Sequence, residues 1–309
     1  MEKESIGHVH HGHEDHHHHH HVPASINGIF ILCIVLNLLF VAIEAGVGFV
    51  YGSVGLLSDA GHNLSDVFSL LIALLAIRMA ARKSTEKFTY GYKKSTVLAS
   101  LLNAVILLVA VGAIIIESIS RLNHPQEVSG AAISWTAGIG ILINGFTAWL
   151  LMRDQDKDLN VKGAFLHMAM DTLVSAGVVV SGIVIYFTGI LWIDPAISLV
   201  IAAIILVSTF NMLKESLFLS LDAVPEAVDM DAIGKGLKEI DGVTGWHHIH
   251  VWAMSTTENA ATVHLVLKDI SSMEEVKDKA RAVFRSAGVE HCTIECEAPG
   301  SHCPARDCC

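Results

Sequence analysis

Six long apolar segments restrict the folds open to this sequence more than any other feature. Each has the about 20 residues that a helix needs to cross about 30 Å of hydrocarbon. The membrane interior offers no water to the backbone, so we expect each segment to be a helix. The segments lie at roughly 28–50, 56–78, 95–118, 130–152, 164–187 and 193–213. The sequence therefore predicts a membrane all-α six-helix bundle over residues 26–215.

Basic residues between the segments predict the orientation of the helices. The first and fifth connections contain no Lys or Arg. The second and fourth connections contain Arg78, Arg82, Lys83, Lys87, Lys93, Lys94, Arg153, Lys157 and Lys162. Because these residues are enriched in cytoplasmic connections of membrane proteins, we expect both termini to lie in the cytoplasm.

The two ends of the chain carry further metal-binding residue types. Residues 1–25 contain little that could pack into a core, so we expect a disordered, His-rich cytosolic tail. Its histidine run is either a native metal-collecting segment or an expression tag. Residues 299–309 form a Cys-rich tail, which offers soft ligands or is an inert end. The candidate ligands in the tails are His16, His17, His18, Cys303, Cys308 and Cys309.

Residues 223–298 have the pattern of a small cytosolic domain. Amphipathic stretches predict two helices, and β-rich stretches predict three strands. In chain order the predicted elements are a helix at 228–240, strands at 243–254 and 260–267, a helix at 272–287 and a strand at 289–297. This α-β-β-α-β order predicts a metallochaperone-like α/β domain. A domain of this size is only marginally stable alone, which favours association with a second copy.

Two copies of the motif His-x-x-x-Asp lie inside the predicted membrane helices. His62 and Asp66 belong to the second segment, and His167 and Asp171 belong to the fifth. An ionisable group at this depth costs about 2.5 kcal/mol or more, so it is kept only where something pairs with it or uses it. Hydrogen bonding between helices could explain one such group. Two imidazoles and two carboxylates on separate helices instead favour a tetrahedral Zn²⁺ site.

The sequence resembles the cation diffusion facilitator family, in the branch of cobalt-zinc-cadmium resistance and vesicular zinc transporters. The resemblance covers nearly the whole chain. The matching stretches are GSVGLLSDAGHNLSD (52–66), KFTYGYKKSTVLASLLNA (87–104), DLNVKGAFLHMAMDTLVS (158–175), WIDPAISLVIAAIIL (192–206) and GVTGWHHIHVWAM (242–254). The resemblance implies a homodimer in a plasma (inner) membrane, expected to be that of a prokaryote. It also implies a secondary antiporter that exchanges cytosolic Zn²⁺ for protons, with Cd²⁺ and Co²⁺ as further candidate substrates.

In that family His62, Asp66, His167 and Asp171 correspond to the transport site. Bound metal requires neutral imidazoles and ionised carboxylates. Free histidine titrates near pH ~6.5 and free aspartate near ~3.9. We therefore expect His62 and His167 to be the groups that couple zinc to protons.

The resemblance also implies a metal site in the cytosolic domain. The matching positions are His247, His264 and Glu297, with His250 and Glu295 nearby. Strand alternation places His247 on one face with Ile249 and Val251, and His248 and His250 on the other. This parity disfavours joint binding by His247 and His250. The alternative is that these side chains merely face solvent.

Two other classes of protein also bury metal ligands in a membrane. A metallohydrolase needs a water-activating carboxylate beside its ligands, commonly in His-Glu-x-x-His, and this sequence contains no such motif. A membrane-bound metal sensor has no need of polar groups through the middle of its helices. The formal net charge of −11 argues against nucleic acid as a partner.

Overall fold

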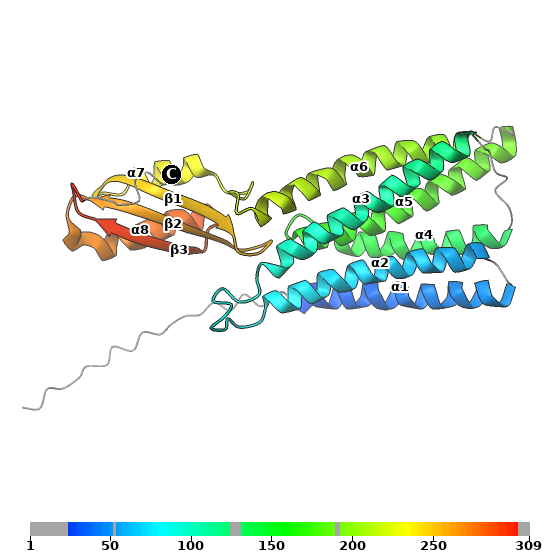
Figure 1. Ribbon diagram of the computed structural model, residues 1–309, viewed down its shortest axis with the longest axis horizontal. Helices are drawn as coiled ribbons and strands as arrows, with labels where there is room; N and C mark the ends of the chain where they lie inside the picture. Colours follow the sequence, from blue (N-terminus) through cyan, green and yellow to red (C-terminus); the bar gives the residue numbers. More distant parts are fainter. Residues whose placement is uncertain (1–23, 52–53, 124–130, 189–191, 302–309) are drawn as a thin grey trace, which may run out of the picture.

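The computed structural model describes residues 24–51, 54–123, 131–188 and 192–301. A group of long helices forms one end of the molecule, and a small sheet with two helices forms the other (Figure 1). The long helices are α1 (Ala24–Tyr51), α2 (Val54–Ala80), α3 (Ser95–Asn123), α4 (Ala131–Met152), α5 (Leu159–Thr188) and α6 (Ile193–Ser220). Each of them coincides with one of the apolar segments.

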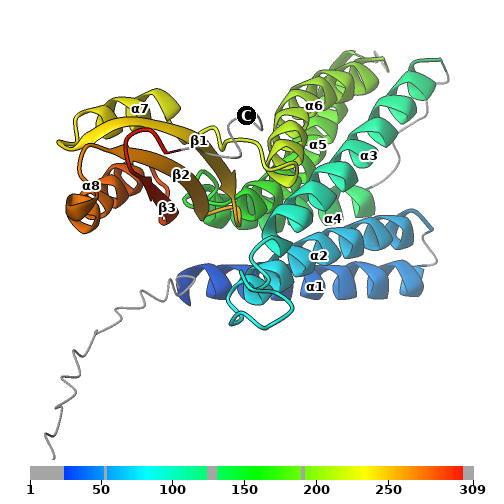
Figure 2. The same cartoon turned by 60° about the vertical axis from the view of Figure 1, so that its left-hand side comes forward.

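Helix α5 joins the two halves of the helical end. Helices α1, α2 and α4 lie on one side of it, and α3 and α6 lie on the other (Figure 2). Met168 packs with residues of α1, α2 and α4, whereas Met170 packs with residues of α3 and α6. Both methionines are almost fully buried. Contacts on both flanks therefore fix the rotation of α5 about its own axis, and this rotation determines the direction of its other side chains.

The outer surface of the helices is apolar. Phe49, Val109, Leu142 and Phe187 are among the large hydrophobic side chains that are mostly exposed. Such a surface suits lipid rather than water. Among the described residues, three stretches are long and apolar enough to cross a membrane, and they are Gly28–Val47, Ser95–Ser120 and Pro195–Ser220. The crossing of all six helices stays a prediction.

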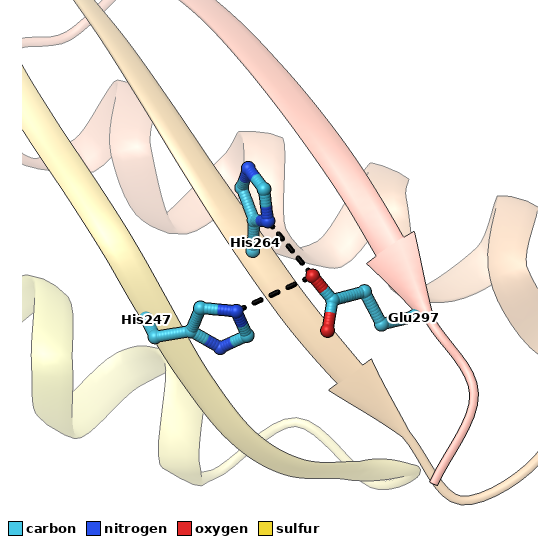
Figure 3. A group of neighbouring side chains, drawn as sticks. All are labelled: His247, His264 and Glu297. Atoms are coloured by element: carbon cyan, nitrogen blue, oxygen red, sulfur yellow. Dashed lines mark hydrogen bonds and ion pairs between the residues drawn. The ribbon is translucent and has the colours of Figure 1, made fainter. Parts of the chain in front are cut away.

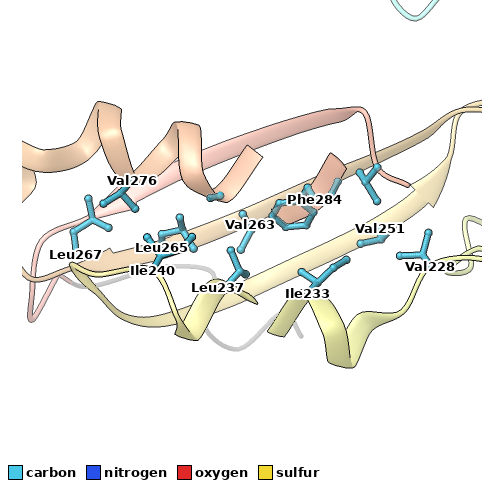
Figure 4. Close-up of a cluster of buried hydrophobic side chains, with 13 residues drawn as sticks. Val228, Ile233, Leu237, Ile240, Val251, Val263, Leu265, Leu267, Val276 and Phe284 are labelled. Atoms are coloured by element: carbon cyan, nitrogen blue, oxygen red, sulfur yellow. The ribbon is translucent and has the colours of Figure 1, made fainter. Parts of the chain in front are cut away.

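The smaller end has one three-stranded sheet with helices on one face (Figure 4). Its elements are α7 (Met230–Lys238), β1 (Val243–Ala253), β2 (Asn259–Leu267), the 3-10 helix η1 (Ile270–Ser272), α8 (Met273–Ser286) and β3 (His291–Glu297). The strand order is β1-β2-β3, with β1 antiparallel and β3 parallel to β2. The predicted order of helices and strands is confirmed.

The core of this domain is formed by residues at strand spacing in β2 and at helix spacing in α8. Val263, Leu265 and Leu267 alternate along β2 and are fully buried. Val276 and Phe284 lie two turns apart on α8 and pack against them. One face of the sheet is therefore covered by α7 and α8, and the polar residues of the strands lie on the other face.

A β-bulge in β1 overturns the alternation that the sequence predicts. His247 pairs with His264, but His250 pairs with Thr262, so β1 contains one extra residue between the two pairs. Trp246 precedes the bulge and Ile249 follows it, and both pack against the core. His247 and His250 therefore lie on the same open face. The expectation that His247 shares a face with Ile249 and Val251 is wrong, because alternation cannot continue through a bulge.

The turn between β1 and β2 contacts the ends of the long helices. The backbone N–H of Thr256 donates to Oγ1 of Thr96 at 3.0 Å, and its hydroxyl donates to Oδ2 of Asp158 at 3.1 Å. Lys93 pairs with Glu258 next to this contact. Burial raises the pKa of Asp158 above its usual value, against hydrogen bonds that lower it. Asp158 directly precedes α5, so the turn of the small domain touches the start of the helix that carries His167 and Asp171.

Apolar packing reinforces this junction. Ala253 at the end of β1 is buried together with Val97, Leu159 and Leu219 from three of the long helices. Nζ of Lys94 donates to the carbonyl oxygens of Leu219 at 2.8 Å and Ala253 at 3.0 Å. The two ends of the molecule therefore share a small core rather than only a flexible connection.

Two candidate metal sites

The first candidate site is a buried group between α2 and α5. Asp66 of α2 and His167 and Asp171 of α5 each offer one ligand atom, and these atoms all lie within 4.8 Å of one another. The residues are 0%, 3% and 8% exposed. Nε2 of His167 is hydrogen-bonded to Oδ1 of Asp66. Three of the four residues predicted from the two His-x-x-x-Asp motifs thus come together.

Helix geometry explains why these side chains meet. His167 and Asp171 are one turn apart and lie on one face of α5. Helix α2 contacts α5, so Asp66 can reach that face. The contacts of Met168 and Met170 on the two flanks of α5 leave this polar face directed into the bundle.

His62 belongs to α2, but its side chain lies outside the described residues. The helix places its Cα one turn before that of Asp66. That position is on the same face of α2 as Asp66. Its role as a fourth ligand stays a prediction.

The donor set of this group suits a divalent cation. A nitrogen ligand and two carboxylates are ligands that Zn²⁺ accepts. Oδ2 of Asp66 is buried and makes no hydrogen bond to the part of the chain that the structure describes. A buried carboxylate oxygen without a donor is costly, and a bound cation would satisfy it.

A third buried carboxylate, that of Glu44, is hydrogen-bonded to a residue of α2 near Asp66. Nδ2 of Asn63 donates to Oε2 of Glu44 at 2.7 Å. Glu44 is 3% exposed and belongs to α1. Asn63 follows His62 directly and precedes Asp66 by three residues, so the pair ties α1 to the ligand-bearing turn of α2. Asn63 is not predictable as part of this contact from the sequence, because no local pattern distinguishes it from other polar residues of the segment.

The second candidate site lies on the open face of the small sheet (Figure 3). His247 of β1, His264 of β2 and Glu297 of β3 bring their ligand atoms within 4.8 Å of one another. Oε1 of Glu297 lies 2.8 Å from Nδ1 of His264 and 3.3 Å from Nε2 of His247. The pKa of Glu297 is lowered, mainly by its hydrogen bond with His264 and further by the nearby charge of His247. These are the three positions that the family resemblance indicates.

The remaining predicted ligands are placed as follows. Oε2 of Glu295 lies 3.3 Å from Nε2 of His264, on a side chain that is 65% exposed. His250 is on the same face but does not belong to the group of three. The tail residues His16, His17, His18, Cys303, Cys308 and Cys309 lie outside the described residues.

Two family models match the chain, one for each end of the molecule. The model described as the cation efflux transmembrane domain matches residues 30–219. The model described as the cation efflux protein, cytoplasmic domain, matches residues 225–299. Together they cover both candidate sites.

Several curated bacterial proteins are similar over most of their length. A cadmium, cobalt and zinc/H(+)-K(+) antiporter of Bacillus velezensis is 35% identical over 263 residues, which are 84% of each chain. The zinc transporter ZitB of Yersinia pestis is 34% identical over 284 residues, 90% of this chain and 89% of its own. The metal cation efflux system protein CzcD of Cupriavidus metallidurans is 34% identical over 260 residues, 84% of this chain and 82% of its own.

Proposed function

This chain belongs to the cation efflux family, and from that premise we propose that it exports Zn²⁺ from the cytoplasm in exchange for protons. It is an integral membrane transporter and not an enzyme, as the sequence predicts. Zinc is named for the Bacillus velezensis antiporter and for ZitB of Yersinia pestis, and CzcD of Cupriavidus metallidurans is named for metal cation efflux. The observation that carries the proposal is the buried group of Asp66, His167 and Asp171.

We assign the transport site to His62, Asp66, His167 and Asp171. Four ligands from α2 and α5 can replace the water around Zn²⁺, which prefers tetrahedral coordination by nitrogen and oxygen. Because the ligands come from two helices, a relative movement of α2 and α5 changes the site. Such a movement could open the site to one side of the membrane at a time.

Protons compete with zinc for these ligands. Zinc binds to neutral imidazoles and ionised carboxylates, so its binding releases protons and its release accompanies protonation. Protons that enter from the far side weaken zinc binding at His62 and His167, and the protonated site then returns to the cytoplasmic side. A downhill proton gradient drives zinc out in this cycle without a nucleotide.

The proposal includes the topology of the chain. All six long helices cross the membrane, and both tails lie in the cytoplasm, because the basic residues gather in the second and fourth connections. Bacterial relatives support a prokaryotic plasma membrane. The domain limits are residues 1–25, 26–215, 223–298 and 299–309.

The cytosolic domain is proposed to bind Zn²⁺ and to pair with its copy in a homodimer. Two imidazoles and a carboxylate at His247, His264 and Glu297 fit the donor types that zinc takes. Glu295 and Glu297 add negative charge on the open face, and bound zinc would offset their repulsion in a dimer. This ion is separate from the transported one.

The proposal is tested with the full-length protein in sealed liposomes. Zinc added on one side should drive protons in the opposite direction, and His167→Ala should abolish both fluxes. His250→Ala is the matched control, because it removes an imidazole from the same chain outside both groups of three. Zinc flux without proton movement would contradict the exchange. A parent protein without zinc flux in either direction would indicate a sensor instead.

A further inference from the structure

The most unusual backbone position in the small domain is at His248. Its φ is +51°, and only one other non-glycine residue, Asp222, has a positive φ among the described residues. Side chains other than glycine rarely adopt this conformation because Cβ approaches the backbone. His248 is also located in the bulge of β1, between the pairs formed by His247 and His250. A bulge and a strained residue at one position commonly serve to redirect a side chain at a functional site.

The bulge brings the ring of His248 to the rings of the candidate metal site. Consecutive residues of a regular strand point to opposite faces, so His247 and His248 would be separated by the sheet. Instead their ring centroids are 5.6 Å apart. The centroids of His248 and His264 are 5.2 Å apart, and those of His247 and His264 are also 5.2 Å apart. The three imidazoles therefore form a nearly equilateral triangle on the open face of the sheet.

We propose that His248 is a further ligand of the metal site in the cytosolic domain, together with His247, His264 and Glu297. The inference rests on the proposed binding of Zn²⁺ to that domain. Zinc sites without catalytic function are almost always closed by four protein ligands, and the group of three lacks one. His248 supplies a third nitrogen, and rotation of its side chain about Cα–Cβ and Cβ–Cγ can direct that nitrogen toward the ion.

The neighbouring side chains fit the fourth position less well. His250 is exposed, whereas His248 is half-buried among the other rings. The centroid of His250 is 6.0 Å from that of His248, on the far side of the bulge from His247. Glu295 reaches the same imidazole as Glu297, but its side chain is 65% exposed against 10% for Glu297. The backbone conformation of His248 places its ring next to the rings of both histidines of the group.

The test uses the full-length protein in detergent, with Asp66→Ala and Asp171→Ala introduced to remove the transport site. Co²⁺ serves as the spectroscopic probe, since its visible absorption is strongest in tetrahedral sites, and Zn²⁺ affinity is measured by displacement of Co²⁺. The tails contribute equally to every variant and cancel in the comparison. We expect His248→Ala to reduce zinc affinity by at least about 10-fold, the lower range for changes around metal ligands. The tetrahedral absorption should fall with it, while His250→Ala should leave both unchanged.

A second variant separates a ligand from a structural residue. Glycine adopts a positive φ without strain, so His248→Gly should leave the unfolding midpoint of the metal-free protein unchanged or raise it. Its zinc affinity should fall as far as that of His248→Ala. A stable protein that binds metal poorly is the signature of a lost ligand.

The outcomes distinguish this inference from the proposal on which it rests. Zinc affinity and absorption equal to the parent's in His248→Gly would overturn the role of His248. A lower unfolding midpoint of metal-free His248→Gly, with its zinc affinity retained, would also overturn it. If His247→Ala and His264→Ala likewise leave the binding unchanged, the cytosolic zinc site itself is refuted, and not only its fourth ligand.

Discussion

The two candidate metal sites use the same kinds of ligand in opposite surroundings. In the helical end, Asp66 and His167 are almost completely buried and belong to two helices. In the sheet, the side chains of His247 and His264 are 23% and 20% exposed and belong to two strands. A fully buried carboxylate in an apolar bundle is costly and must be compensated. The carboxylate of Glu297 is 10% exposed and lies on an open sheet face beside Glu295, whose side chain is 65% exposed, so water can reach this group. From this difference we expect the first group to bind the transported ion and the second group to bind and release zinc as the cytosolic zinc concentration changes.

The largest effect should come from removing a ligand of the buried group. Asp66→Asn keeps the size of the side chain but removes its charge, and we expect zinc transport to fall by at least about 100-fold, the upper range for changes around metal ligands. His62→Ala should have the same effect. The measurement is zinc uptake into inverted vesicles, with membrane insertion checked by protein level. Substantial transport by both variants would show that the buried group is not the transport site, and the proposed difference in role between the two sites would be wrong.

The pH dependence should sharpen the comparison next. Replacing both His62 and His167 by Asp leaves four carboxylates at the buried site. Because free aspartate titrates near ~3.9 and free histidine near ~6.5, the midpoint of zinc binding against pH should move to lower pH. Zinc affinity is measured across a pH series in the parent and the double variant. An unchanged midpoint would show that the histidines are not the proton-linked ligands.

Zinc at the exposed site should change the distance between subunits. Bound metal offsets the negative charge of Glu295 and Glu297, so zinc should draw two cytosolic domains together. Fluorescence distances between labelled domains are followed during a zinc titration. His264→Ala should abolish the change while transport falls by less than about 10-fold, because the buried ligands stay intact. If His264→Ala reduced transport as much as Asp66→Asn does, the two sites would not have separate roles.

A smaller effect concerns the stability of the metal-free cytosolic domain. His264 holds the pKa of Glu297 below its usual value, so ionised Glu297 stabilises the fold above the ordinary carboxyl pKa near ~4.3. This contribution is lost as the pH falls through the lowered value in the folded state. Glu297→Gln should therefore lower the free energy of unfolding at pH ~7 by about 0.5–1.5 kcal/mol, the net contribution of a typical hydrogen bond. The difference should vanish in strong acid, as measured by fluorescence of Trp246 and Trp252.

The smallest effect should follow removal of the His-rich tail. Deletion of residues 1–25 takes away no ligand of either site, so transport at saturating zinc should equal that of the parent. At low zinc the tail can raise the local metal concentration, and a modest reduction is expected there. Zinc uptake is measured over a range of concentrations. A complete loss of transport at saturating zinc would make the tail part of the transport machinery.

Much of the fold could be predicted because the spacing of apolar residues along the sequence indicates the helices and strands. The apolar segments predicted the long helices to within a few residues at most ends, although α5 begins earlier than expected, at Leu159, and α6 continues beyond its apolar segment to Ser220. The alternation in β2 and the amphipathic pattern of α8 predicted the cytosolic domain. The meeting of Asp66 with His167 was predicted from a repeated motif, since buried ionisable groups need partners.

The sequence by itself determined the apolar segments, the paired motifs and the helix and strand order, because each depends on residues only a few positions apart. Tertiary structure alone decided where β1 is bulged, since the extra residue is defined only by its pairing with β2. It also decided the contact of Thr256 with Asp158, across 98 residues of sequence. Periodicity reports which face of an element is apolar, but it cannot report which residue of another element lies opposite. For that reason the open face of the sheet, and the place of His248 on it, followed only from the folded chain.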